Sequence, residues 1–186
     1  MSLKQVRQIK NKVVINGFQW DKGDGKLLFV TDQTGAVNIY NGETFSHQPL
    51  HVINDFHNGP CYAIAVDRAN RFLVTGGTDS LIGLWDLADF MLIKSISNND
   101  YKVMSVSVSH EGNFIASICE DDINKKYLVE VYDFDYNDPE MPSDTLYSYT
   151  SSYEKQLITW NPKRNVLAFA GEEKDSGVVH ILNPGS

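Results

Sequence analysis

The stretch "GGTDSLIGLWDL", residues 76–87, decides how the rest of the chain is interpreted. It holds a polar turn with Asp79, an apolar alternation typical of a half-buried strand, and a closing pair, Trp85 and Asp86. A single copy would be only a strand with a polar end. Copies at a regular interval would determine the whole fold, because periods of about 20–50 residues are the mark of repeat architectures.

Similar strand endings recur at intervals of 45, 47 and 50 residues. They are "AVNIYN", "LIGLWD", "LVEVYD" and "VVHILN", ending at Asn41, Asp86, Asp133 and Asn183. The same layout precedes each ending: an alternating strand, a short polar turn, and a more continuous apolar strand. Weaker strands are expected between the units at 50–56, 91–97 and 145–151. The sequence therefore predicts units of four antiparallel strands, and no helical periodicity competes with that interpretation.

The composition is that of a folded protein with an excess of negative charge. The 186 residues are 42% hydrophobic, and 16 Lys and Arg face 24 Asp and Glu, for a net charge of −8. This balance disfavours broad contact with nucleic acid or anionic membrane. The start of the chain lacks the apolar stretch of a secretory signal, and no run is long enough to span a membrane. Cys61 and Cys119 lie in apolar runs and are expected to be reduced core thiols.

Four-stranded units that repeat about every 40–50 residues and end on Trp-Asp resemble the WD40 repeat family, whose fold is an all-β propeller. The resemblance implies that residues 1–186 are a single propeller segment of about four blades from a seven-bladed ring. The blades are expected at 11–56, 57–97, 101–152 and 153–183. It also implies that 5–12 is the outer strand of a preceding blade. The last blade would need one more strand, which is typical of the C-terminal portion of a longer protein.

Members of the family have a buried hydrogen-bonded network of four side chains in a blade. It consists of a His before the first strand, a Ser or Thr in the second strand, an Asp in the turn after the second strand, and the Trp of the third strand. By resemblance these residues would be His57, Thr75, Asp79 and Trp85. A buried carboxylate at a tight turn needs donors, which such side chains can supply. The other units depart from this pattern. Tyr40, Tyr132 and Leu182 replace the Trp, and Asn98, Asn99 and Asp100 stand where the third unit would have its His.

Within the family, the sequence resembles the WD40 subunits of THO complexes. The similarity lies in "RFLVTGGTDSLIGLWDLADFMLIKSIS" and above all in "ITWNPKRNVLAFAGEEKDSGVVHIL". The second contains Trp160, Pro162, Lys163, Arg164, Leu167, Ala168, Phe169 and Ala170. The resemblance implies a nuclear, non-catalytic scaffold of the THO/TREX complex, which couples transcription to mRNA processing and export. Its partners would be THO-type helical subunits, with RNA contacted only indirectly. The alternative is a WD40 adaptor or peptide reader in another assembly, of the chromatin or ubiquitin-ligase type.

No residue pattern predicts catalysis, a cofactor or a metal site. Acidic clusters at 120–122, 133–140 and 172–175 could bind a cation, but each follows a strand and is more typical of solvated loop charge. The five histidines do not pair with cysteines at zinc spacing. The strand starts nearest the propeller axis are predicted to be apolar, at Val14, Cys61, Val103 and Leu157. A peptide reader would need an acidic or aromatic central pocket, which an incomplete ring is not expected to form by itself.

Tyrosines gather in the segment 132–152, which is the preferred candidate for a partner-binding edge. Aromatic side chains are frequent hot spots of protein interfaces. Tyr136, Tyr147 and Tyr149 are therefore candidate partner-binding residues, and packing between blades is the alternative. The open flanks of an incomplete ring are expected to bury their apolar surface against another copy or a partner.

Overall fold

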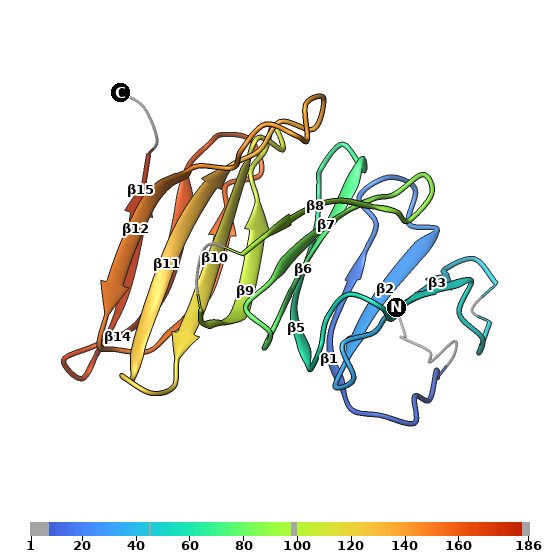
Figure 1. Cartoon of the computed structure of the whole chain (residues 1–186), viewed down its shortest axis with the longest axis horizontal. Helices are drawn as coiled ribbons and strands as arrows, with labels where there is room; N and C mark the ends of the chain where they lie inside the picture. Colours follow the sequence, from blue (N-terminus) through green and yellow to red (C-terminus); the bar gives the residue numbers. More distant parts are fainter. Residues whose placement is uncertain (1–7, 45, 98–99, 184–186) are drawn as a thin grey trace, which may run out of the picture.

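The computed structural model describes residues 8–44, 46–97 and 100–183, which form four antiparallel sheets (Figure 1). The first sheet contains β1 (Ile15–Trp20), β2 (Leu27–Asp32), β3 (Val37–Asn41) and β4 (His51–Ile53). The second contains β5 (Cys61–Val66), β6 (Phe72–Gly77), β7 (Ile82–Asp86) and β8 (Leu92–Ile96). The third contains β9 (Lys102–Val108), β10 (Phe114–Asp121), β11 (Lys126–Asp133) and β12 (Thr145–Ser151). The fourth contains β13 (Lys155–Trp160), β14 (Leu167–Glu173) and β15 (Ser176–Leu182).

The predicted all-β fold of about four antiparallel units is confirmed. Each sheet lies within one of the expected blade ranges, and the division of the chain into a single four-blade segment stays a prediction. The outer strand expected at 5–12 falls partly on residues 5–7, outside the described residues, and residues 8–12 are not a strand. The described part of the fourth sheet has three strands, and residues 184–186 lie outside the description.

The sheets stand side by side in chain order, and their first strands are neighbours (Figure 1). Strand β1 contacts β5, β5 contacts β9, and β9 contacts β13. We call these four the inner strands. Each is followed by a short turn, at 21–26, 67–71, 109–113 and 161–166, and we call these four the inner turns.

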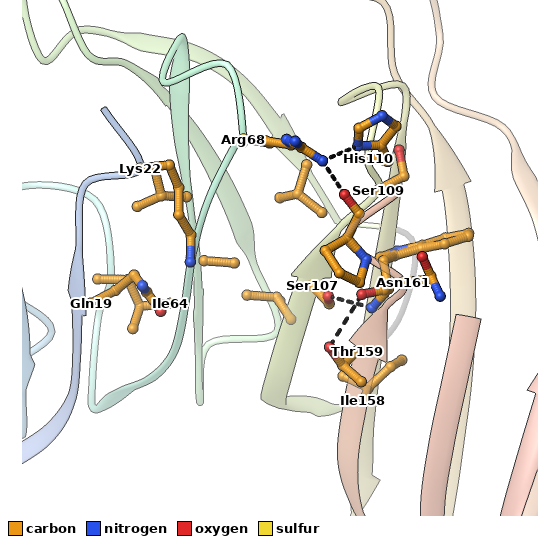
Figure 2. A pocket seen from close by; sticks show the side chains of 16 residues that line it. Gln19, Lys22, Ile64, Arg68, Ser107, Ser109, His110, Ile158, Thr159 and Asn161 are labelled. Atoms are coloured by element: carbon orange, nitrogen blue, oxygen red, sulfur yellow. Dashed lines mark hydrogen bonds between the residues drawn. The ribbon is translucent and has the colours of Figure 1, made fainter. Parts of the chain in front are cut away.

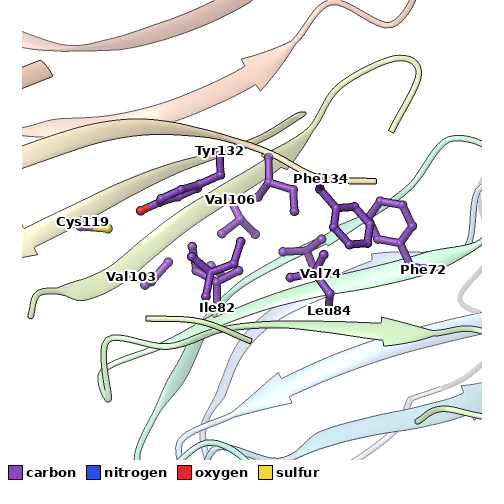
Figure 3. Packing of buried hydrophobic residues seen from close by; sticks show 12 residues of the cluster. Phe72, Val74, Ile82, Leu84, Val103, Val106, Cys119, Tyr132 and Phe134 are labelled. Carbon is purple, nitrogen blue, oxygen red and sulfur yellow. The ribbon is translucent and has the colours of Figure 1, made fainter. Parts of the chain in front are cut away.

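Apolar clusters fill the spaces between successive sheets. Figure 3 shows the one between the second and third sheets, where Phe72, Val74 and Leu84 face Val103 and Val106. All five are buried, and a side chain of this size contributes roughly 1.5–3 kcal/mol when it leaves water. Equivalent clusters join the first sheet to the second and the third to the fourth. The hydrophobic alternation of the strands therefore holds the sheets together, and each central sheet is buried on both faces.

The inner turns of the second and third sheets are tied together by Arg71. Its side chain donates to Asp67 Oδ2 at 2.7 Å within its own turn and to the carbonyl of Glu111 at 2.9 Å in the next. Gly112 makes this approach feasible, because it has a φ of 77° and a Cβ there would lie 2.1 Å from Arg71 Nη2. The turn sequence thus fixes the spacing between two sheets as well as the hairpin itself.

Candidate functional site

Four side chains of the second sheet and its flanking loops form a continuous hydrogen-bonded chain. Trp85 Nε1 donates to Thr75 Oγ1 at 3.0 Å, and this hydroxyl lies 2.8 Å from His57 Nε2. His57 Nδ1 lies 3.0 and 3.2 Å from the two carboxylate oxygens of Asp79. The structure therefore brings together the four residues that the resemblance singles out.

The direction of each bond follows from the protonation of His57. Burial lowers the pKa of His57, and the Asp79 carboxylate opposes that effect without reversing it, so the imidazole is neutral. A carboxylate accepts, so the proton lies on His57 Nδ1, and Nε2 accepts from the Thr75 hydroxyl. Asp79 also accepts from the backbone N–H groups of Asn58 and Leu81. The network thus fastens the loop before β5 to the β6–β7 turn.

The other sheets contain only partial counterparts. In the third sheet, the Tyr132 hydroxyl donates to Glu130 Oε2 at 2.6 Å, and burial raises the pKa of Tyr132. In the fourth sheet, Leu182 occupies the position of Trp85, as their pairing with the preceding strand shows. Asn98 and Asn99, which stand where the third unit would have its His, lie outside the described residues.

Strand register corrects the predicted axis-proximal positions. The residue of the fourth sheet that is equivalent to Cys61 is Lys155 and not Leu157, because each pairs with a glycine just before an irregularity in the register. In the first sheet the equivalent residue is Ile15 and not Val14. The expectation of an apolar residue in the fourth sheet was wrong, because the same irregularity follows Ile15, Cys61 and Val103 in the other sheets and aligns Lys155 with them.

Lys155 is the centre of a second polar cluster. Its side chain is fully buried, and its Nζ lies 3.0 Å from Glu173 Oε1. Glu173 also accepts from His180 Nε2 at 2.8 Å and from the Tyr149 hydroxyl at 3.1 Å. These bonds, that of Lys155 foremost, lower the pKa of Glu173 to about 2. The interpretation of residues 172–175 as solvated loop charge is therefore wrong for Glu173, which joins the third sheet to the fourth.

The three candidate partner-binding tyrosines are half-buried within the chain. The Tyr136 hydroxyl donates to Asp86 Oδ2 at 2.8 Å, which links the third sheet to the second. Tyr149 is bonded to Glu173, and Tyr147 packs against the apolar cluster between the third and fourth sheets. Their observed role is packing between sheets, and contact with a partner stays a prediction.

A groove of about 550 Å³ follows the inner strands, and we call it the axial groove (Figure 2). Each sheet contributes to its lining, with Gln19, Ile64, Ser107 and Thr159 as examples. Toward the inner turns it is lined by Lys22, Arg68 and His110, and none of its lining residues is Asp or Glu. Four sheets are thus enough to form a groove. Its lining combines basic, neutral polar and apolar side chains with the aromatic Trp160, and it lacks the acidic side chains that were one expectation for a peptide reader.

The described residues hold no further group suited to redox or metal chemistry. Cys61 and Cys119 are buried, and burial raises the pKa of Cys61 to about 12, which keeps the thiol protonated. In the described ranges, no three His, Cys, Asp or Glu side chains gather as metal ligands. No helix in that part of the chain is long and apolar enough to cross a membrane.

Comparison with known proteins gives similarity at three levels. The family model for the WD domain, G-beta repeat, matches residues 47–86. "THO complex subunit 3" of Arabidopsis thaliana is 27% identical over 185 residues, which are 96% of this chain and 54% of the relative. "WD repeat-containing protein AAC3" of Dictyostelium discoideum is 25% identical over 99 residues, 52% of this chain and 20% of the relative. The chain thus spans about half the length of the relative it matches throughout.

Solved structures share the fold. The β-propeller domain of Cps50 (Swd1) from Myceliophteria thermophila has a TM-score of 0.70 at 17% identity, covering 90% of this chain and 53% of that one. U3-55K has a TM-score of 0.70 at 14% identity, covering 91% and 52%. Identities this low show the fold alone, and they agree with the WD-domain match and with the hydrogen-bonded network of the second sheet. On these grounds residues 47–86 match a WD40 repeat, and the chain has the fold of a β-propeller segment whose four sheets are blades.

Proposed function

We propose that the chain is the WD40 scaffold subunit of a THO-type complex and has no catalytic role. The observation that carries this proposal is the similarity to "THO complex subunit 3" along 96% of the chain. The match to the Dictyostelium discoideum WD-repeat protein covers only 52% of the chain. Similarity through all four sheets supports a shared subfamily more strongly than similarity through one or two repeats.

The chemistry of the described residues supports a scaffold. Two sets of buried polar side chains bond to neighbouring side chains: His57 with Thr75 and Asp79, and Lys155 with Glu173. Such networks make the sheets rigid, and rigid sheets present their loops and edges to partners in fixed positions.

In this proposal the chain acts in the nucleus, where THO-type assemblies couple transcription to mRNA processing and export. Its partners are the helical subunits of that assembly. Direct contact with RNA is not part of the proposal, since the net charge of −8 opposes broad phosphate binding.

A second candidate function is that of a peptide-reading adaptor in another assembly. The axial groove favours it, because such a concave surface can hold an extended segment. The two candidates predict different partners, so one reconstitution separates them.

The test is coexpression of the 186-residue chain with the helical THO-type subunits of its own organism. Native mass spectrometry of the purified assembly should show one copy of the chain in each complex. A WD-repeat segment from an unrelated assembly, tagged in the same way, is the control and should stay unbound. If the folded chain elutes alone while the other subunits assemble without it, the proposal is refuted.

A further inference from the structure

We propose that the basic end of the axial groove binds an acidic peptide segment of a partner protein. The basic end is the part of the groove lined by Lys22, Arg68 and His110. This inference rests on the proposed scaffold function and names the chemistry of one docking site.

Lys22 supplies a positive charge that no described residue pairs with. Its backbone N–H donates to Asn70 Oδ1 at 3.1 Å, which fixes the first inner turn against the second. Its exposed ammonium group forms no hydrogen bond or ion pair with any residue that the structure describes. The turn is therefore anchored while the charge remains available to a ligand.

Arg68 is held in place by a histidine ring nitrogen and a backbone carbonyl. Its Nη1 donates to His110 Nδ1 at 2.8 Å and to the carbonyl of Pro162, so it bridges the inner turns of the second, third and fourth sheets (Figure 2). A guanidinium has five N–H donors, and its remaining ones can bind a carboxylate. Because His110 Nδ1 accepts from Arg68, the ring hydrogen lies on Nε2, which is a further donor.

The acids of the inner turns bond to other groups. In the first turn Asp24 pairs with Lys26 at 2.7 Å, and Asp21 accepts from the backbone N–H of Leu27 at 3.4 Å. Asp67 is paired with Arg71 at 2.7 Å, and Glu111 Oε2 accepts from Asn165 Nδ2 at 3.3 Å. No acidic side chain lines the groove, although acids outnumber bases 24 to 16 in the chain. The groove lining therefore holds basic side chains and no acidic ones, unlike the chain as a whole, and electrostatic complementarity favours an acidic ligand.

The remaining lining fits a polypeptide. Ile64, Val106 and Ile158 provide apolar surface between the charged groups. Trp160 lines both this groove and a smaller pocket of about 180 Å³, and its buried Nε1 has no hydrogen-bond partner among the described residues. A bound peptide brings apolar side chains that can cover this surface.

Acidic loops around the basic end favour a short peptide over a nucleic acid. Strands β9 and β11 are both antiparallel to β10, so the β11–β12 loop opens at the same end as the inner turns. A hydrogen bond of 2.9 Å from the Phe134 N–H to the Asn113 carbonyl joins this loop to the inner turn of the third sheet. This loop contains Asp135, Asp138, Glu140 and Asp144. A long polyanion would cross it and be repelled, whereas a short acidic segment can end within the groove.

The test is fluorescence anisotropy with the full 186-residue chain and two labelled peptides. One alternates glutamate with leucine, and the other has glutamine in place of each glutamate. Variants Lys22→Gln and Arg68→Gln remove the two charges. Lys125→Gln, an exposed lysine in the β10–β11 turn, is the matched control. Circular dichroism melting checks that each variant is folded. Lys22→Gln remains informative if Arg68→Gln unfolds, since the Lys22 side chain contacts no described partner.

The acidic peptide should bind with an affinity that falls as salt rises, and the glutamine peptide should not bind. Each groove substitution should weaken binding about fivefold, as expected for one charge contact, and Lys125→Gln should leave it unchanged. Equal binding of both peptides, or unchanged binding in Lys22→Gln, would overturn the proposal. So would tighter binding of single-stranded oligouridylate at the same site. If the chain binds the acidic peptide yet fails to assemble with THO-type subunits, the groove proposal stands and the proposed function fails.

Discussion

Replacing Thr75 by valine is the sharpest test of the network in the second sheet. Valine keeps the shape of threonine and removes only the hydroxyl, which is the central link of the hydrogen-bonded chain. Thr75 is 0% exposed, so no solvent can substitute for it. The substitution leaves the Trp85 indole N–H without an acceptor and His57 Nε2 without a donor.

The magnitude follows from these two orphaned groups. A buried polar group left unsatisfied costs about 1–3 kcal/mol, and Trp85 and His57 are only 4% and 6% exposed. Some local relaxation is expected, so the free energy of unfolding should fall by about 3 kcal/mol. At the entropy of unfolding usual for a chain of this size, this corresponds to a drop of about 6–12 °C in the melting temperature.

Urea unfolding followed by tryptophan fluorescence measures the change directly. Thr150→Val is the matched control, because Thr150 is an exposed strand residue whose hydroxyl forms no hydrogen bond with the described residues. It should change the free energy of unfolding by less than about 0.5 kcal/mol. A loss below about 1 kcal/mol for Thr75→Val, with the same urea dependence as the parent, would refute the directional network.

Three further predictions concern pH and the fourth sheet. Burial lowers the pKa of His57, so at mildly acidic pH the unfolded chain binds a proton that the folded chain does not. The free energy of unfolding, measured by urea titration, should therefore fall as the pH drops below about 6.5. A flat profile between pH 5 and 7 would contradict a neutral His57. Gly171→Ala should lower the melting temperature strongly, because the added Cβ would lie 1.9 Å from a carbonyl oxygen. Gly177→Ala is the control and should have almost no effect, because its Cβ would meet nothing within 4 Å. Equal effects of the two substitutions would disprove the close approach at Gly171. Glu173→Gln should lower the melting temperature, because buried Lys155 loses its anion, and it should make stability depend less on pH below 4.5. Adding Lys155→Met should restore part of the lost stability. The absence of such recovery would argue against the ion pair.

The sequence predicts the strands well because half-buried strands have a local pattern. The alternation around Trp85 and its recurrence at near-constant intervals are enough to place the sheets. The residues of the second-sheet network follow from a family resemblance, and their spacing agrees with the observed bonds between His57, Thr75 and Asp79.

The polar cluster of the fourth sheet could not be predicted in the same way. The register irregularity of each first strand assigns Lys155, and not Leu157, to the buried position of the fourth sheet, and the apolar alternation of the strand does not show where this irregularity falls. The partners of Glu173 come from three strands, so its low pKa depends on contacts that only the assembled sheets provide. The same holds for Arg68, which reaches a carbonyl in the fourth sheet 94 positions away.

The two end sheets differ from the central ones in what holds them. Leu157, Val179 and Ile181 on the fourth sheet are 65–70% exposed, and Phe18 on the first is 69% exposed. Each would gain roughly 1.5–3 kcal/mol on burial, so the end sheets lack a stabilisation that the second and third sheets obtain from two neighbours. Local opening should therefore begin at the ends, and a partner that covers either face stabilises the folded chain by mass action. The expectation that these flanks bury against a partner or another copy thus has a thermodynamic basis that does not depend on which partner binds.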